Sequence, residues 1–275
     1  MRVLMKVRIG RAALYAVLLS TGVTFAGAAP AVDAADAAQH VPPEPALNSL
    51  PALPLAQMSA MMQMDDAQHT GRVLLEQLEW RDTDAGSAAV WEGFAWYGGD
   101  YNKLWLRTEG ERVRGTTDNA RAELFWHHLI TRWWNLQTGA REDFGNGPSR
   151  GWVAFGVQGL APYWLDVEAT AYAGEAGRTA ARLRVMYDLL LTQRCIVQPE
   201  AEMNFYGKSD PDRQVGSGLS DLEVGIRVRY EIRREFAPYI GVAWRGLFGA
   251  TADRTRAAGF SVSDLQILTG VRLWF

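Results

Sequence analysis

A cluster of soft metal ligands lies near the N-terminus of this 275-residue chain, in the segment MSAMMQMDDAQH. Thioether sulfur favours Cu(I), whereas carboxylate and imidazole groups suit Cu(II). Methionines spaced a few residues apart on a flexible segment can close around one ion without a preformed fold. The candidate copper ligands, for either oxidation state, are Met58, Met61, Met62, Met64, Asp65, Asp66 and His69.

The same methionines have an alternative role. Methionine is a common filler of irregular apolar gaps, so the cluster could instead be an apolar strip on a short helix that plugs or leans on the rest of the protein. Pro51 and Pro54 stand at the start of that helix. The choice between the two roles depends on what the rest of the chain forms.

The first 28 residues have the pattern of a secretory signal peptide. Four basic residues precede an apolar run over residues 12–25, and Ala26-Gly27-Ala28 has the small-x-small form of a cleavage site. The run is shorter than the roughly 20 residues that span a bilayer, which argues against a retained anchor. Residues 29–71 are rich in Ala and Pro without a sustained period, so we predict a flexible periplasmic tail there.

Charge and cysteine content exclude several classes. Without residues 1–28, 24 of the 28 Lys and Arg remain against 31 Asp and Glu, so the formal charge falls from -3 to -7. A nucleic-acid partner is not expected at this charge. No later stretch approaches 18 consecutive apolar residues, which leaves strands as the only means of crossing a membrane. Cys195 is the only cysteine, so no internal disulfide is expected.

Residues 72–275 alternate between apolar and polar side chains. In SDLEVGIRVRYEIR, residues 220–233, the even positions from Leu222 to Ile232 are apolar, while the odd ones are charged or glycine. Only a strand sorts residues with a period of two. Similar runs of roughly 9 to 14 residues, separated by Gly- and Asp-rich turns, recur about twelve times and are long enough to cross a bilayer.

The predicted fold is therefore all-β, an antiparallel transmembrane β-barrel of about twelve strands with a flexible N-terminal tail. The 11 Trp, often at the ends of the alternations, fit two aromatic girdles. A soluble β-sandwich is the alternative, but its strands are typically only about 5 to 6 residues long. Pro199 falls within a strand, where we expect a β-bulge. The terminal Phe275, after alternating apolar residues, is similar to the signal by which outer-membrane barrels are handed to their assembly machinery.

Long segments of the barrel region resemble the copper resistance protein B family of outer-membrane proteins. They are WEGFAWYGGDYNKLWLRTEGE (91–111), GVQGLAPYWLDVEATAYAGEAG (156–177), LLLTQRCIVQPEAEMNFYGKSD (189–210), GSGLSDLEVGIRVRYEIRREFAPYIGVAW (216–244) and the ending GVRLWF. The resemblance covers roughly residues 73–275 and implies an outer-membrane barrel in a periplasmic copper-handling system. Family members usually carry an N-terminal extension rich in Met and His. Here that extension has only His40 and His69, which departs from a high-capacity copper-binding tail.

The polar faces of the strands give a second candidate site. Mixed charges inside a small barrel usually form a salt-bridged interior that fixes its shape. Alternatively, a subset forms a cation path, since rings of Asp and Glu favour cations. The candidate path residues are Asp166, Glu168, Met186, Asp188, Glu200, Glu202, Asp221, Glu223 and His127. His127 and His128 are adjacent, so they face opposite ways in a strand, with His127 on the lumen side.

The expected function is a contribution to copper resistance, by binding copper ions and passing them across the outer membrane or holding them for periplasmic copper proteins. The alternative is a small porin or structural barrel that handles no metal. No G-x-S-x-G motif is present and neither barrel histidine has an evident Ser partner, so no enzymatic activity is expected. We expect a monomeric barrel in outer-membrane lipid.

Overall fold

The computed structural model describes residues 54, 57, 58, 61, 68–84 and 86–275. The predicted signal peptide and most of the predicted tail lie outside these residues. The chain divides into two units, residues 1–62 and residues 63–275, and all the strands among the described residues belong to the second unit. None of the described helices is long and apolar enough to cross a bilayer.

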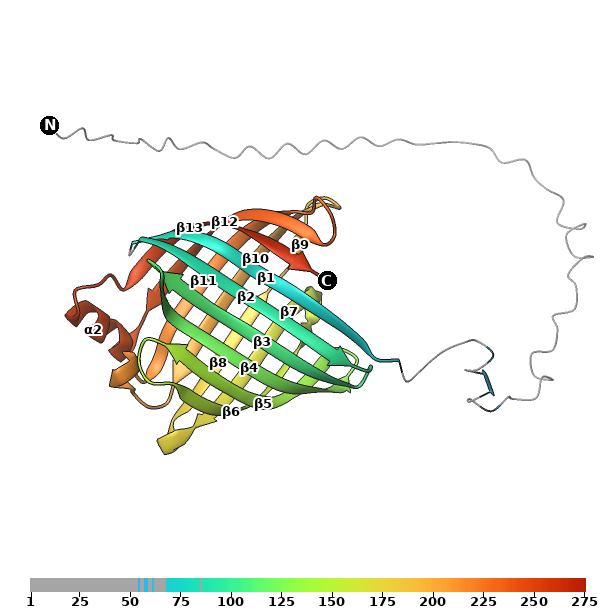
Figure 1. Ribbon diagram of the computed structural model, residues 1–275, viewed down its shortest axis with the longest axis horizontal. Coiled ribbons are helices and arrows are strands. Elements are labelled where there is room, and N and C mark those ends of the chain that lie inside the picture. The colour runs from blue at the N-terminus through green and yellow to red at the C-terminus, as the bar shows by residue number, and fades with distance from the viewer. Residues whose placement is uncertain (1–53, 55–56, 59–60, 62–67, 85) are drawn as a thin grey trace, which may run out of the picture. The chain divides into compact units, whose positions relative to one another are not determined.

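The second unit is a closed antiparallel β-barrel (Figure 1). The strands are β1 (Thr70–Thr83), β2 (Gly86–Gly98), β3 (Asn102–Val113), β4 (Thr116–Thr131), β5 (Trp134–Gly145), β6 (Arg150–Ala161), β7 (Leu165–Gly174), β8 (Thr179–Met186), β9 (Leu189–Leu190), β10 (Cys195–Tyr206), β11 (Gly218–Tyr230), β12 (Phe236–Leu247) and β13 (Ser263–Trp274). β1 pairs with both β2 and β13, and β10 pairs with both β8 and β11, so the ring has no free edge. β8 and β9 follow each other along the same edge of β10, so they occupy a single position around the barrel. The thirteen strands therefore fill twelve positions, and we call each position a stave. The predicted barrel is confirmed, and the sandwich is excluded.

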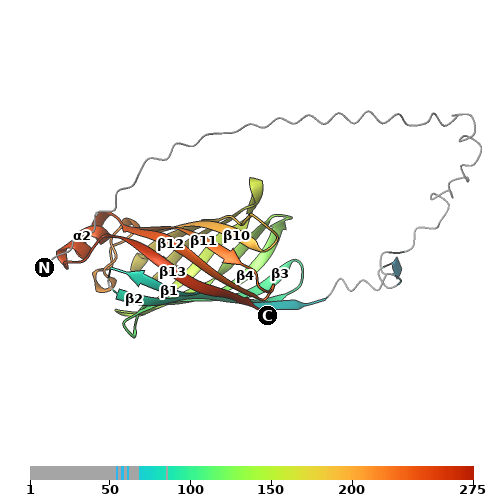
Figure 2. The same cartoon turned by 90° about the horizontal axis from the view of Figure 1, so that it is seen from above.

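The two ends of the barrel differ. β1 begins and β13 ends at one end, where Val73 and Phe275 exchange backbone hydrogen bonds. Figures 1 and 2 place the helix α2 (Gly249–Ala257) at the opposite end. That end also carries the two longest connections, 207–217 and 248–262. The end with the termini thus has the shorter connections, as the periplasmic end of an outer-membrane barrel does.

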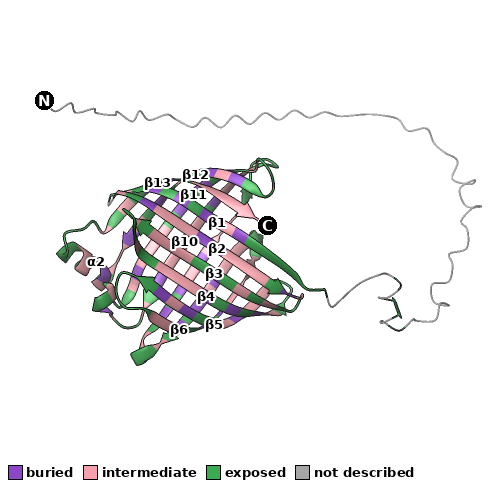
Figure 3. Ribbon diagram, in the orientation of Figure 1, coloured by how far each residue is buried: buried purple, intermediate pink, exposed green. Residues whose placement is uncertain are grey.

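The alternating sequence produces an inside-out distribution of side chains (Figure 3). Leu265 and Ile267 are 69% and 68% exposed, while Glu123 and Arg182 are 1% and 2% exposed. Apolar side chains thus face outward toward lipid and charged ones face the interior. Successive strand residues point to opposite faces, so within an uninterrupted register the alternation of the sequence assigns side chains to lipid or lumen.

Local sequence explains one tight hairpin. Arg114 and Gly115 connect β3 to β4, and both have positive φ, 49° and 88°. Two positive φ values define the type I′ turn, whose twist matches that of a β-hairpin. Glycine adopts that conformation without steric cost.

The predicted β-bulge at Pro199 is wrong. β10 keeps one register across this residue, with β8 and β9 on one side and with β11 on the other. The missing proline N–H removes a ladder bond but requires no additional residue. The neighbouring strand is interrupted opposite Pro199, where β8 ends at Met186 and β9 begins at Leu189. Tyr187 still donates its N–H to the Pro199 carbonyl at 3.1 Å.

Candidate functional site

Three cavities follow one another along the interior of the barrel. The terminal chamber, about 270 Å³, lies at the end that holds the first residues of β1 and the last of β13. The middle chamber is about 120 Å³, and the distal chamber, at the end that carries α2, is about 370 Å³. Glu92 lines both the terminal and the middle chamber, whereas Asn119, Asp221 and Arg245 line both the middle and the distal chamber.

The terminal chamber brings together four of the predicted path residues, namely Asp166, Glu168, Met186 and Asp188. Asp166 and Met186 are directly opposite each other in the β7–β8 register. Directly opposed residues on one face have Cβ atoms about 4.5–5.5 Å apart. The sulfur of Met186 accepts a hydrogen bond from Gln198 Nε2 at 3.6 Å. A thioether and a carboxylate therefore share one wall of this chamber.

Asp166 differs from the other carboxylates of the terminal chamber. Arg107 donates two hydrogen bonds to Glu168, at 2.8 and 2.7 Å, and Arg229 pairs with Asp188 at 3.1 Å. Glu76 pairs with Arg272 at 3.4 Å. Among the described residues Asp166 makes no ion pair and no side-chain hydrogen bond. Its oxygens are free to accept a cation.

The middle chamber holds the other four predicted carboxylates, which are Glu200, Glu202, Asp221 and Glu223. Three of them are paired with arginine. Glu200 contacts Arg184 and Arg227, each at 2.6 Å, while Glu202 pairs with Arg182 at 2.7 Å and Glu223 with Arg81 at 2.9 Å. Asp221 accepts a hydrogen bond from Asn204 at 2.9 Å.

Ion pairs join into a belt that crosses the lumen. The belt alternates in charge and runs through Glu92, Arg184, Glu200, Arg227, Glu79, Arg81 and Glu223. Its centre is Glu79, whose side chain is fully buried and accepts hydrogen bonds from Arg81, Arg227 and the Tyr239 hydroxyl. These residues come from β1, β2, β8, β10 and β11, so the belt ties distant staves together. The predicted salt-bridged interior is confirmed.

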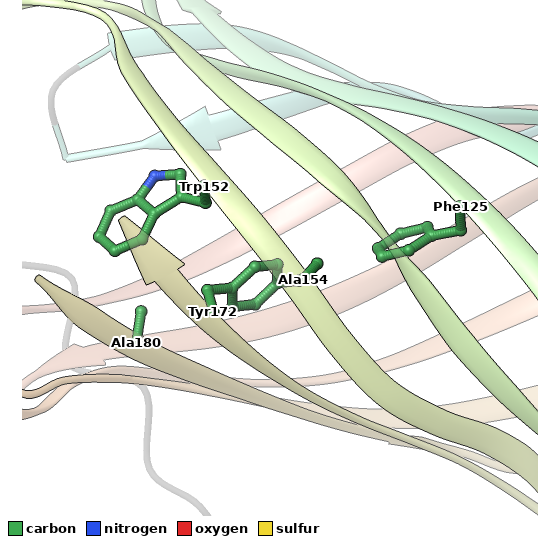
Figure 4. Close-up of a cluster of buried hydrophobic side chains, with 5 residues drawn as sticks. All are labelled: Phe125, Trp152, Ala154, Tyr172 and Ala180. Carbon is green, nitrogen blue, oxygen red and sulfur yellow. The ribbon is translucent and has the colours of Figure 1, made fainter. Parts of the chain in front are cut away.

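The wall formed by β4, β6, β7 and β8 is partly aromatic. Figure 4 shows Phe125, Trp152, Ala154, Tyr172 and Ala180 in one buried cluster on these strands. The Tyr172 hydroxyl donates to Glu123 at 2.8 Å, and Trp152 Nε1 donates to Asp143 at 2.8 Å. The aromatic groups thus fill space and also hold acidic side chains in place.

His127 lies inside the barrel, as predicted, and is 4% exposed. Its ring stacks on Trp105, with centroids 5.0 Å apart and planes 5° apart, and Trp105 lines the terminal chamber. His127 Nε2 is buried without a hydrogen-bond partner among the described residues. His128 takes the opposite side, where it stacks on the exposed Trp126. His127 itself is not among the residues that line the chamber.

The predicted tail site is only partly described. Met58 and Met61 are helical, three residues apart, and 37% and 74% exposed. His69 precedes β1 and stacks on Tyr97, with ring centroids 5.9 Å apart. Met62, Met64, Asp65 and Asp66 lie outside the described residues. Whether the seven candidates meet around one ion stays a prediction.

Several lumen carboxylates were not predicted. They lie on β1 to β3 and are Glu76, Glu79, Glu92, Glu109 and Glu111. A signal for some of them is present in β3, where Arg107, Glu109 and Glu111 share one parity and alternate with the exposed Leu104 and Leu106. In β1 the parity changes at a register shift between Leu75 and Gln77.

The interior favours cations. Five carboxylates face four arginines in the terminal chamber, and seven face five in the middle chamber. No group of three or more His, Cys, Asp and Glu in the described part of the chain is arranged to hold a metal ion. Carboxylates attract cations of many kinds, and the thioether adds a preference for soft ions such as Cu(I). The arrangement suits a cation that passes and is released more than one that is held permanently.

A cluster of ion pairs lies at the distal end of the barrel. Asp210, in the connection between β10 and β11, pairs with Arg150 at 2.8 Å and with Arg178 at 3.3 Å. The hydrogen bond from Arg150 lowers the pKa of the Asp210 carboxyl, and the charges of Arg150 and Arg178 add to this effect against the opposing effect of burial. The connection is therefore held to the first residue of β6 and to the turn before β8 at neutral pH.

Comparison with known proteins shows the family and the fold. The family model "Copper resistance protein B precursor (CopB)" matches residues 69–275. A copper resistance protein B homolog of Pseudomonas syringae pv. tomato is 48% identical over 213 residues, which cover 78% of this chain and 72% of the relative. Copper resistance protein B of Escherichia coli is 47% identical over 203 residues, 74% of this chain and 69% of the relative. Among solved structures, the NanC porin aligns with a TM-score of 0.51 and 10% identity over 73% of this chain and 98% of the porin, a likeness of fold alone.

Proposed function

The chain belongs to the copper resistance protein B family, and from this premise we propose that it binds copper ions and passes them through its barrel across the outer membrane. The family and the fold are those of copper resistance proteins and outer-membrane barrels. Copper is the cargo in this proposal, not a resident cofactor. The proposal assigns the barrel no enzymatic role.

One observation carries the proposal. Met186 and Asp166 face each other across β7 and β8 in the terminal chamber, and Asp166 has no cationic partner among the described side chains. A soft sulfur beside an unpaired carboxylate provides ligands for both oxidation states of copper. The excess of carboxylates over arginines in the terminal and middle chambers supports entry of a cation.

The N-terminal segment supplies the second part of the proposal. We propose that a cleaved signal exports the chain and that the cluster Met58, Met61, Met62, Met64, Asp65, Asp66 and His69 binds copper in the periplasm. The chain enters the barrel through His69 and Thr70, at the end where the terminal chamber lies. Copper held by the cluster would pass to the chamber or to periplasmic copper proteins.

Copper flux into lipid vesicles that contain the purified mature chain tests this proposal. We expect copper uptake above that of protein-free vesicles, and a reduced rate for Asp166→Asn and for Met186→Leu. The matched control is Met203→Leu, because Met203 alternates with the inward-facing Asn204 and lies on the outer face of β10. Met203→Leu should leave the uptake of copper unchanged.

Two results would overturn the proposal. Copper uptake equal to that of protein-free vesicles would exclude passage through the barrel. Equal permeability to copper and to small neutral solutes, unaffected by Met186→Leu, would instead identify a general porin. The tail is tested separately, by copper titration of the full mature chain with all four clustered methionines changed to Leu, where an unchanged Cu(I) affinity would exclude the cluster as a site.

A further inference from the structure

A single arginine stands between the terminal and the middle chamber. Arg184 lines the terminal chamber and Glu200 lines the middle one, while Glu92 lines both. Arg184 is therefore located where the two cavities meet. The side chains of Arg184, Glu92 and Glu200 are 4%, 7% and 11% exposed, so the contact between them is closed to bulk water.

The guanidinium of Arg184 is held on two sides. Its Nη2 donates to Glu92 Oε2 at 2.7 Å, and its Nη1 pairs with the other oxygen of the same carboxylate. Its Nε donates to Glu200 Oε1 at 2.6 Å. Glu92 lies on β2, so this pair reaches across the barrel from β8. Arginine is suited to this role because its planar fork matches carboxylate oxygens and stays charged at any physiological pH.

The residues around Arg184 are those that a metal cation would use. Met186 lies between Asp166 on β7 and Glu200 on β10 in the strand register, two residues beyond Arg184. Without the guanidinium, Glu92 and the Oε1 atom of Glu200 would lose their arginine partner, while Oε2 of Glu200 stays paired with Arg227. The positive charge of Arg184 thus occupies a position whose surroundings are built for a cation.

We propose that Arg184 is the selectivity-determining residue of the barrel, a tethered cation in the position that a metal cation must take to pass from the terminal to the middle chamber. This inference rests on the proposed passage of copper through the barrel. A cation that enters the terminal chamber competes with the guanidinium for Glu92 and Glu200. Glu168 and Glu202 lie opposite Arg184 on its two neighbouring strands, so the displaced guanidinium has other carboxylates within its reach.

Ion conductance of the full mature chain in planar lipid bilayers tests the inference with K⁺ as the probe. We expect Arg184→Gln to raise the K⁺ conductance several-fold and to shift the reversal potential in a KCl gradient toward cation selectivity, because Glu92 loses its arginine partner and Glu200 loses one of its two. The double variant Glu92→Gln/Arg184→Gln should keep the higher conductance with a smaller shift. The matched control is Arg229→Gln. Arg229 is another buried lumen arginine with one carboxylate partner, and it lines neither the terminal nor the middle chamber.

The outcomes separate the inference from the proposed function. K⁺ conductance of Arg184→Gln equal to that of the wild type, or an equal rise in Arg229→Gln, would overturn the role of Arg184. If Arg184→Gln does not fold, as judged by the heat-dependent gel mobility of barrels, the double variant decides, because it removes both charges of the pair. Absence of copper uptake by the wild type would overturn the proposed function, whereas the K⁺ response does not depend on copper.

Discussion

The terminal chamber and the middle chamber are both lined by carboxylates and arginines, but they differ in how these groups are paired. In the middle chamber six of the seven carboxylates pair with arginine, in the ion-pair belt, around Arg182 or with Arg245, and Asp221 accepts a hydrogen bond from Asn204. In the terminal chamber Asp166 has no cationic partner among the described residues and faces a methionine sulfur. The same residue types are therefore paired in ion-pair networks that join distant strands in one chamber, and include an unpaired carboxylate in the other.

The difference follows from the cost of burying charge. A buried carboxylate is tolerated when its hydrogen bonds and its charge are satisfied, and breaking such a pair is strongly destabilising. The belt meets this condition and fixes the lumen. Asp166 is half-buried and has no ion pair among the described residues, so a cation that enters the terminal chamber would supply an opposite charge there.

The largest expected effect comes from breaking the belt at its centre. Glu79→Gln should lower the free energy of unfolding by about 3–5 kcal/mol, because it leaves Arg81 and Arg227 without their shared carboxylate. Urea unfolding in detergent measures the change. The control is Asp253→Asn, an exposed ion pair on α2 that should have no measurable effect. A Glu79→Gln barrel as stable as the wild type would mean that the belt does not hold the staves.

The second prediction compares an unpaired carboxylate, Asp166, with a paired one, Glu168, in the terminal chamber. Asp166→Asn should weaken copper binding by about tenfold, or about 1.4 kcal/mol, without loss of stability, because no ion pair among the described residues is broken. Glu168→Gln should instead lower stability, since Arg107 loses a bidentate partner. Copper titration and urea unfolding of both variants give the comparison. Equal losses of stability in the two variants would remove the distinction between paired and unpaired carboxylates.

The sequence alone predicted which side chains face the lumen. The period-two alternation of β7, β8, β10 and β11 predicted that the seven path carboxylates and Met186 face away from lipid, because each strand assigns alternate residues to one face. The sequence alone could not predict which carboxylate pairs with which arginine. Glu92 meets Arg184 and Glu79 meets Arg227 across strands far apart in the chain, so only closure of the barrel decides which carboxylate is left without a partner.

The first strands show why part of the lumen was missed. In β1, Leu74 and Gln77 are both buried, 3% and 6% exposed, although they are three residues apart. A register shift between Leu75 and Gln77 changes the parity at that point. A simple count by two along the strand then assigns the following residues to the wrong face. Glu79, the centre of the belt, lies just beyond this shift.

A third prediction extends the comparison to a paired carboxylate outside the membrane. Asp210 has a lowered pKa because Arg150 and Arg178 bind its charged form. The unfolded carboxyl titrates near its usual value of about 3.9, so the stabilising contribution is present above that pH and is lost as the pH falls through the lower folded pKa. At about pH 7 Asp210→Asn should be less stable than the wild type, and the difference should close in acid. Thermal unfolding at both pH values measures it, and a difference that does not depend on pH would contradict the pairing.

The smallest expected effect concerns the wall beside the terminal chamber. β8 ends at Met186 and β9 begins at Leu189, so the strand is interrupted at Tyr187 and Asp188, opposite Pro199. Pro199→Val would restore a backbone donor in a register that is already continuous, so one more ladder bond can form without moving either strand. A single net hydrogen bond contributes about 0.5–1.5 kcal/mol, and the lost rigidity of proline in the unfolded chain offsets part of it. We expect slower amide hydrogen exchange from Tyr187 to Leu190 with little change in global stability, and unchanged exchange there would mean that the interruption has another cause than the missing proline N–H.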